Sequence, residues 1–210
     1  MVEPNPKVFV IDDDASVLKS LSRLLRSSGL EAQTFESAEQ FLERNHYEGV
    51  GCIVLDVEMP GLSGTALQDR LNASGLSMPV IFITGHGNIS MGVGAMKKGA
   101  VDFLTKPFDD EALLGAVRKA IETDTRAKAE RTELRETLRH LGQLTPRELE
   151  VLRCVISGMP NKRIALKLKI SEKTVKIHRG HIMKKLDAAS VAELVRMASR
   201  AGIEPILNSI

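Results

Sequence analysis

The sequence predicts an α/β protein, a doubly wound parallel sheet of five strands, followed by a small all-α domain of four helices with a helix-turn-helix. Three observations favour this fold class. Over residues 7–121, short apolar runs alternate with stretches of helical period, which is typical of buried parallel strands joined by right-handed crossovers. From residue 144 onward, four helix starts follow within about sixty residues. The net charge also changes sign between these two parts.

The five strands are expected near residues 7–11, 31–35, 50–55, 79–83 and 101–105. The stretches between them have the spacing of amphipathic helices. In the first, Leu18, Leu21 and Leu25 recur on one face, and Gly29 ends the helix. A similar apolar stripe over residues 112–121 predicts the helix that follows the last strand.

Residues 123–143 differ in composition and form a predicted helical linker rich in Arg and Glu. Leu134, Leu138 and Leu141 follow one another at i, i+4 and i+7. The stripe fits pairing with a second copy of the chain, but a solvated charged helix explains it equally well.

Residues 144–210 begin with a clear helix start. Thr145 is the expected N-cap, Pro146 suits the first helical position, and Glu148 completes a capping box. Asn161, Ser171 and Ser190 are the expected caps of three further helices. Short connections at residues 158–161 and 169–171 suit a helix-turn-helix.

The charge of +2 for the whole chain conceals a division. Residues 1–122 hold 11 Lys or Arg against 17 Asp or Glu, a net charge of −6, and residues 123–143 hold 5 against 4, a net of +1. Residues 144–210 hold 13 against 6, a net of +7. A small basic module indicates a nucleic-acid partner.

Membrane and secreted proteins are not favoured. No apolar run approaches the ~20 residues of a membrane helix, and the start lacks the basic head and apolar stretch of a signal peptide. Cys52 and Cys154 fit small core residues rather than a disulfide. We therefore expect a cytoplasmic protein with no membrane partner.

Polar residues at the ends of four apolar runs are the first candidate site. They are Asp12, Asp13, Asp56, Thr84 and Lys106. Because the carboxyl ends of parallel strands meet at one edge of the sheet, these residues are expected to converge there. Carboxylates, a hydroxyl and an ammonium group predict a site for a phosphoryl group and a hard divalent cation.

The helix expected over residues 171–186 is the second candidate site. Its inward face carries Val175, His178, Ile182 and Leu186. Its outward face carries Lys173, Ile177, Gly180 and Lys184, flanked by Thr174, Lys176 and His181. An outward isoleucine among lysines suits a DNA major groove, where it can contact a thymine methyl group.

These motifs resemble a known family. The residues that carry the resemblance are Asp12-Asp13, Asp56 followed by Met59-Pro60-Gly61, Thr84-Gly85-His86-Gly87, Gly99-Ala100-Val101-Asp102-Phe103 and Lys106-Pro107-Phe108. Residues 1–122 resemble the flavodoxin-like receiver domain of two-component signalling, and residues 144–210 resemble a LuxR-type DNA-binding domain. Together they resemble response regulators of the NarL/FixJ type, nearest to the FixJ branch.

The resemblance implies roles for the acidic site. Asp56 is expected to accept a phosphoryl group, with no enzymatic activity beyond self-phosphorylation and slow autodephosphorylation. Mg²⁺ is expected on Asp13, Asp56 and the backbone carbonyl of Glu58, with Asp12 acting through a metal-bound water. Lys106 would pair with the phosphoryl oxygens and Thr84 would donate its hydroxyl. The Lys106–Pro107 peptide bond is expected to be cis.

It also implies a switch and partners. In the family, Thr84 would move toward the phosphoryl group and Phe103 would rotate inward, so that the chain forms a homodimer. The implied partners are a sensor histidine kinase, a two-fold related DNA site bound with help from the last helix, and RNA polymerase as a further candidate. Base contacts are implied for Lys176, Ile177 and Gly180, and phosphate contacts are expected from Lys173, Thr174, Arg179 and Lys184.

The helix expected near residues 88–98 holds a feature particular to this chain. Gly92 and Gly94 lie in its interior, and each costs a helix roughly 1 kcal/mol relative to alanine. One hypothesis is that this helix is marginal in the resting state and orders on activation.

Two other functions remain as alternatives. Asp12-Asp13-Asp14 after a strand is similar to the start of haloacid-dehalogenase-like phosphatases, with Asp12 as nucleophile and Asp14 as general acid. Ser16 does not fit that pattern, and Asp109-Asp110 open a helix instead of following a strand. An RNA-binding output domain is the other alternative, which the capped four-helix pattern disfavours.

Overall fold

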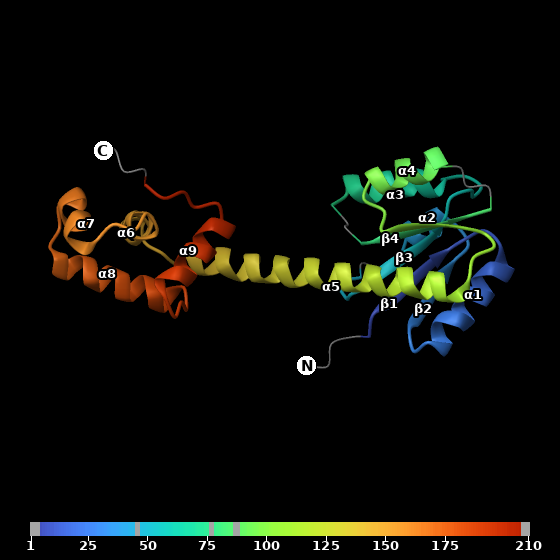
Figure 1. Cartoon of the computed structure of the whole chain (residues 1–210), viewed down its shortest axis with the longest axis horizontal. Coiled ribbons are helices and arrows are strands. Elements are labelled where there is room, and N and C mark those ends of the chain that lie inside the picture. The colour runs from blue at the N-terminus through green and yellow to red at the C-terminus, as the bar shows by residue number, and fades with distance from the viewer. Residues whose placement is uncertain (1–4, 45–46, 76–77, 86–88, 207–210) are drawn as a thin grey trace. The chain divides into compact units, whose positions relative to one another are not determined.

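The computed structural model describes residues 5–44, 47–75, 78–85 and 89–206 and confirms the predicted fold class. Its five strands form one parallel sheet in the order β2-β1-β3-β4-β5 (Figure 1). Their bounds are β1 Lys7–Ile11, β2 Glu31–Phe35, β3 Gly51–Asp56, β4 Val80–Thr84 and β5 Asp102–Thr105. The chain divides into two compact units, residues 1–128 and 129–210, and each is described by itself.

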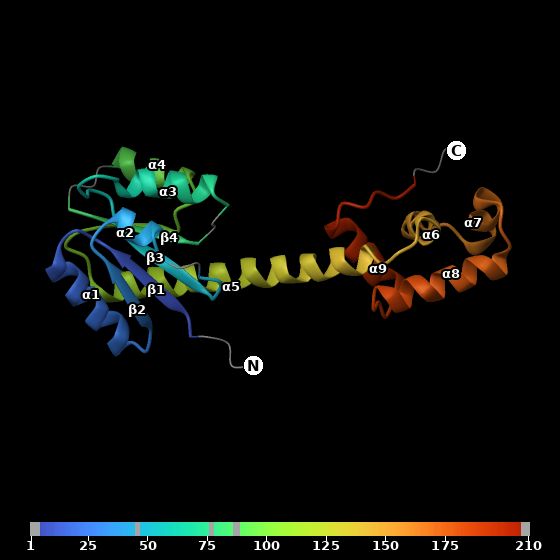
Figure 2. The ribbon, with the colours of Figure 1, turned by 180° about the vertical axis from the view of Figure 1, so that it is seen from behind.

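Helices cover both faces of the sheet. One face packs against α1 Ala15–Ser27 and the first turns of α5 Asp110–Leu141. The opposite face packs against α2 Ala38–Leu42, α3 Gly64–Ala73 and α4 Ile89–Lys97. Figures 1 and 2 show α3 and α4 on one side of the sheet, with α1 on the other. The alternation of strand and helix along the chain builds these layers because each crossover returns over a face of the sheet.

The strand register brings the carboxyl ends together. Ile11 of β1 lies beside Leu55 of β3, so Asp12 and Asp56 follow at the same edge. Asp56 pairs with Ile83, and Thr84 pairs with Thr105. The strands β1, β3 and β4 are buried over nearly their whole length, which explains why their apolar runs are almost continuous.

Helix α1 has a capped start and ends just before Gly29, as expected for its end. Asp14 is its N-cap, with a side-chain oxygen that accepts a hydrogen bond from the backbone amide of Ser16. Gly29 follows the last turn with φ of +79°, the left-handed conformation that glycine adopts without strain.

A buried carboxylate on helix α5, which was not predicted from the sequence, forms hydrogen bonds to the sheet. Asp124 accepts hydrogen bonds from the backbone amide of Gly51, at 2.8 Å, and from Nζ of Lys128, at 2.8 Å. Lys128 also donates to the backbone carbonyl of Gly49. An Asp and a Lys four residues apart on a charged helix look like a solvated pair in the sequence, so nothing in their spacing predicted burial.

The second unit is a helical domain. Its helices are α6 Pro146–Ile156, α7 Asn161–Leu168, α8 Glu172–Lys185 and α9 Val191–Arg200, and Leu141 at the end of α5 packs against their core. The caps Thr145, Ser171 and Ser190 are confirmed, and Thr145 forms the full capping box with Glu148.

The predicted cap at Asn161 is wrong. Pro160 is the N-cap of α7 and offers no side-chain hydrogen bond, while Asn161 is already helical. The side-chain oxygen of Asn161 instead accepts a hydrogen bond from Arg179 of α8, at 2.9 Å. A contact between two helices decided the role of this residue, whereas the prediction rested on local preference alone.

Both cysteines are buried free thiols in the core, as expected. Burial raises the pKa of Cys52 to about 12 and also raises the pKa of Cys154. Within the described ranges, no helix is long and apolar enough to cross a bilayer.

Candidate functional site

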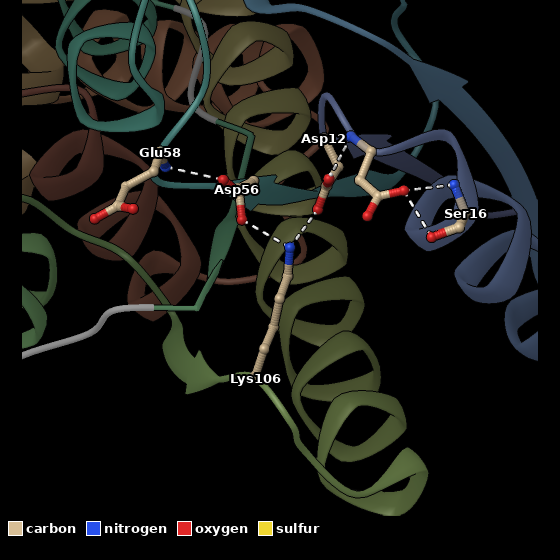
Figure 3. Close-up of polar contacts among 6 residues, drawn as sticks. Asp12, Ser16, Asp56, Glu58 and Lys106 are labelled. Atoms are coloured by element: carbon tan, nitrogen blue, oxygen red, sulfur yellow. Dashed lines mark hydrogen bonds and ion pairs between the residues drawn. The ribbon is translucent and has the colours of Figure 1, made fainter.

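Two buried carboxylates share one lysine at the carboxyl edge of the sheet. The Nζ atom of Lys106 lies 2.6 Å from Oδ2 of Asp12 and 2.9 Å from Oδ1 of Asp56 (Figure 3). Asp12 is 1% exposed and Asp56 is 5% exposed. Three residues at the carboxyl ends of β1, β3 and β5 thus meet as the sequence predicted, because these strands end at the same edge.

Opposing influences act on the pKa of Asp56. Burial raises this pKa, and the charge of Asp12 raises it further. The hydrogen bond and the charge of Lys106 lower it, but the net result is a raised pKa. Burial lowers the pKa of Lys106, but its hydrogen bonds to Asp12 and Asp56 outweigh burial and raise it overall. Lys106 therefore remains an ammonium group between two crowded carboxyl groups.

Thr84 lies fully buried at the end of β4, beside the lysine segment. Its backbone carbonyl accepts a hydrogen bond from the amide of Lys106, at 2.7 Å. The Lys106–Pro107 bond is cis, as expected. The two predicted phosphoryl-binding residues are therefore joined through the backbone.

Glu58 and Asp13 are placed differently. The backbone amide of Glu58 donates to Oδ2 of Asp56, at 2.9 Å, and its carboxylate points away from the pocket (Figure 3). Asp13 follows Asp12 in an exposed position. Of the predicted cation ligands, the structure therefore brings Asp12, Asp56 and the backbone of Glu58 together, and Asp13 is exposed next to Asp12.

The oxygen donors of the pocket match a hard cation in chemical type. Asp12 and Asp56 supply carboxylates, and Mg²⁺ prefers oxygen ligands with few protein groups and several waters. In the part of the chain that the structure describes, no three His, Cys, Asp or Glu side chains are grouped to hold a metal. Asp13, Asp56, the backbone carbonyl of Glu58 and water would suit Mg²⁺, which needs few ligands from the protein.

Asp14 does not have the position of a general acid. Its Oδ1 accepts hydrogen bonds from the hydroxyl of Ser16, at 2.6 Å, and from the amide of Ser16, at 2.7 Å. The hydroxyl bond and then the amide bond lower the pKa of Asp14, so this exposed group is held as a carboxylate. A proton donor is what the phosphatase alternative needs at this position.

Phe103, the predicted switch residue, lies half-buried on β5. Its ring is 6.5 Å from the ring of Phe82, its pairing partner on β4, at an interplanar angle of 47°. On α4, Gly92 faces the same ring. His86 and Gly87, which belong to the Thr84 motif, and Asn88, at the start of the predicted helix, lie outside the described residues.

The second candidate site is the outward face of α8. Val175, Ile182 and Leu186 are buried and His178 is half-buried, as the helical spacing predicted. On the opposite side, Ile177 is 49% exposed beside the exposed Lys173, Lys176, Gly180, His181 and Lys184, with Thr174 half-buried. The helix thus presents a basic face with one apolar side chain near its middle.

Two features of this face were not apparent in the sequence. Arg179 is half-buried and donates to Asn161, so α7 fixes its direction. Glu148 was predicted only as a cap, yet it is 3% exposed and its Oε2 also accepts from Nζ of Lys185, at 2.6 Å. Its Oε1 lies 3.6 Å from Nδ1 of His181. Burial would raise the pKa of Glu148, but the bonds from Lys185 and Thr145 lower it to about 2.

Comparison with known families divides the chain in the same way. Residues 8–118 match the response regulator receiver domain, and residues 142–198 match the luxR family of bacterial regulatory proteins.

Relatives with both parts are similar over nearly the whole chain. Nodulation protein W of Bradyrhizobium diazoefficiens is 48% identical over 200 residues, covering 93% of this chain and 86% of that protein. The transcriptional regulatory protein FixJ of Azorhizobium caulinodans is 46% identical over 198 residues, covering 94% of each. The solved structure of the response regulator StyR has a TM-score of 0.84 at 45% identity, covering 93% of this chain and 99% of that one. These comparisons give no support to the phosphatase alternative.

Proposed function

The chain belongs to the transcriptional response regulators of the NarL/FixJ type, which join a receiver domain to a LuxR-type DNA-binding domain, and we infer that phosphorylation of Asp56 controls its binding to DNA. The observation that carries this inference is the buried pair of Asp12 and Asp56 around Lys106. A sensor histidine kinase is the expected phosphoryl donor, and DNA is the expected target.

Asp56 is the acceptor in this proposal. Its Oδ1 and Oδ2 are held by Lys106 and by the amide of Glu58, so the carboxylate is oriented before the donor arrives. Once Asp56 is an acyl phosphate, Lys106 pairs with the new phosphoryl oxygens as a point charge. The hydroxyl of Thr84 donates to another of these oxygens, and the movement of Thr84 makes space for Phe103.

Receiver domains generally bind Mg²⁺ at this acidic pocket. In this chain Asp13, Asp56 and the backbone carbonyl of Glu58 would hold it, with Asp12 acting through water. The ion supplies positive charge that offsets repulsion between the carboxylates and an incoming phosphoryl group. Slow hydrolysis then removes the phosphoryl group from Asp56. Self-phosphorylation and this hydrolysis are the only reactions that we assign to the receiver.

The phosphoryl acceptor is tested by intact mass after incubation with acetyl phosphate and Mg²⁺. We expect a single added phosphoryl group in the wild-type protein and none in Asp56→Asn. Asp14→Asn is the matched control, because it removes a neighbouring carboxylate that only caps α1, and it should be phosphorylated like the wild type. A phosphoryl group that persists in Asp56→Asn and disappears in Asp12→Asn would instead support the phosphatase alternative.

The outward face of α8 is the proposed DNA-reading surface. Lys176, Ile177 and Gly180 are assigned to base edges in the major groove. Lys173, Thr174, Arg179 and Lys184 are assigned to phosphates, which give affinity with little sequence choice. Homodimerisation on phosphorylation would place two copies of α8 on a two-fold related site, with α9 contributing to the dimer. RNA polymerase is a further candidate partner.

Binding to a DNA site selected from a random library tests this surface. Ile177→Ala is expected to lower specific affinity by about 1 kcal/mol through the loss of its apolar contact. Leu166→Ala is the control, since Leu166 is 73% exposed on α7, outside the proposed face. Lys173→Ala should weaken binding to all sequences and reduce the dependence of log K on log salt by about 0.9. Equal losses in Ile177→Ala and Leu166→Ala would contradict the assignment.

A further inference from the structure

Gly92 of α4 lies directly against the ring of Phe103. A Cβ atom added at Gly92 would stand 3.3 Å from Cδ1, 3.5 Å from Cγ and 3.7 Å from Cε1 of that ring. The first distance is shorter than the optimal separation of about 3.5–4.0 Å between carbon atoms. Even the smallest side chain at this position would therefore crowd the aromatic ring.

The backbone does not explain this glycine. Gly92 lies within a helix and is not among the residues with positive φ, so any residue could adopt its conformation. Glycine in a helix interior also has a poorer helix propensity than alanine. What distinguishes the position is its contact with Phe103.

Gly94, two residues further along α4, provides the comparison. It has the same poor helix propensity, but apart from the neighbouring backbone of α4 itself, no described atom lies within 4 Å of an added Cβ. Alanine at Gly94 would strengthen the helix without touching Phe103, whereas alanine at Gly92 would strengthen the helix and crowd the ring.

The ring cannot yield to such crowding by sinking into the sheet. Phe82, its neighbour on β4, is fully buried, and protein interiors are packed too densely to accept a displaced ring. The remaining response is a rotation of Phe103 away from α4 or a displacement of α4 itself.

We propose that Gly92 is a positioning residue for Phe103: the bare Cα lets the ring rest against α4, and a methyl group there drives the ring away from α4 and opposes the inward rotation that accompanies activation. The direction of the effect rests on the proposed function, in which rotation of Phe103 accompanies phosphorylation of Asp56. Gly92 acts only through Phe103 and contacts no phosphoryl group.

The test uses the full chain with Gly92→Ala, Gly94→Ala, and each of these combined with Phe103→Leu. Dimerisation is measured by sedimentation velocity with and without acetyl phosphate and Mg²⁺. With acetyl phosphate and Mg²⁺, Gly92→Ala should raise the dimer dissociation constant about three- to tenfold relative to the wild type, the population change expected when a side chain is forced about 30° from its rotamer. Gly94→Ala should leave the constant within about twofold of the wild type, and Phe103→Leu should remove the difference between the two glycine variants.

Equal effects of Gly92→Ala and Gly94→Ala would overturn the proposal, because helix propensity would then explain both. The proposal would also be overturned if the wild-type protein dimerises on phosphorylation and Gly92→Ala has the same dimer dissociation constant as the wild type.

A second readout separates this inference from the proposed function. The chain has six phenylalanines, so the ring resonances of Phe103 can be assigned by selective labelling and by their loss in Phe103→Leu. They should shift in Gly92→Ala and stay unchanged in Gly94→Ala. If the phosphorylated wild type does not dimerise, the proposed function fails in that respect, and the ring resonances alone decide whether Gly92 positions Phe103. Identical resonances in both glycine variants overturn the positioning role.

Discussion

Asp56 in the receiver and Glu148 in the DNA-binding domain are both buried carboxylates paired with a lysine, yet their pKa values move in opposite directions. Lys185 pairs with no second carboxylate among the described residues, Glu148 accepts two further hydrogen bonds from Thr145, and the pKa of Glu148 falls to about 2. Asp56 shares Lys106 with Asp12, accepts a single backbone hydrogen bond in addition, and has a raised pKa. The number of hydrogen-bond donors around each carboxylate therefore distinguishes Glu148, whose charge stabilises the fold, from Asp56, the proposed phosphoryl acceptor.

The largest expected effect comes from neutralising the fully satisfied carboxylate. Glu148→Gln removes the buried carboxylate that accepts hydrogen bonds from Lys185 and Thr145, so we expect the free energy of unfolding at pH 7 to fall by about 3 kcal/mol. Because the folded-state pKa of Glu148 is lowered, this stabilisation exists above its ordinary value of 4.5 and is lost as pH falls toward about 2. Urea unfolding of the wild type and of Glu148→Gln, followed by circular dichroism between about pH 2 and pH 7, measures this loss. A difference in the free energy of unfolding that does not change with pH would contradict the assignment to Glu148.

Removing each lysine separates the two carboxylates by their response to a cation. Lys106→Met and Lys185→Met should each lower the free energy of unfolding by about 2 kcal/mol, since each leaves a buried anion uncompensated. Added Mg²⁺ should restore stability to Lys106→Met, where Asp13 and Asp56 offer oxygen ligands and Asp12 acts through water, and leave Lys185→Met unchanged. A common response to Mg²⁺ would show that the two carboxylate sites do not differ in the proposed way.

Neutralising Asp56 should increase the free energy of unfolding, whereas neutralising Glu148 should decrease it. A raised folded-state pKa means that the ionised group opposes folding, so Asp56→Asn is expected to increase the free energy of unfolding by about 1 kcal/mol at pH 7. The gain should vanish below pH 3.8, where the wild-type carboxyl group is protonated in both states. Amide exchange of β1 and β3 reports the change, with α6 as the internal reference. Destabilisation at neutral pH would refute the sign.

The smallest effect is expected for an ion pair that water surrounds. Glu150 pairs with Arg147 at 2.6 Å, but its side chain is 53% exposed. Glu150→Gln should change the free energy of unfolding by less than about 0.5 kcal/mol in the same urea titration. A loss as large as that of Glu148→Gln would mean that burial is not the property that distinguishes these glutamates.

The sequence predicted the elements of the acidic site because periodicity and strand ends are local signals. Asp12, Asp56 and Lys106 meet because each follows an apolar run, and the carboxyl ends of parallel strands lie at the same edge of the sheet. The half-exposed Ile177 on α8 was likewise predicted from helical spacing alone.

Contacts between distant residues were not predictable in this way. Asp124 is 73 residues from Gly51, Glu148 is 37 from Lys185, and Arg179 is 18 from Asn161. The sequence shows such residues only as ordinary members of charged helices or caps, because their burial depends on how helices pack. The Asn161 prediction failed for the same reason.

The two buried thiols have a practical consequence for testing the proposed dimer. Maleimides and other alkylating reagents attack the thiolate, and neither Cys52 nor Cys154 offers one to solvent near neutral pH. A single new thiol at an exposed position such as Ser20→Cys should therefore be the selective target for a spin label or dye, with the native cysteines retained. Interprobe distances between two copies could then be followed as acetyl phosphate is added, without first rebuilding the core to remove its sulfur atoms.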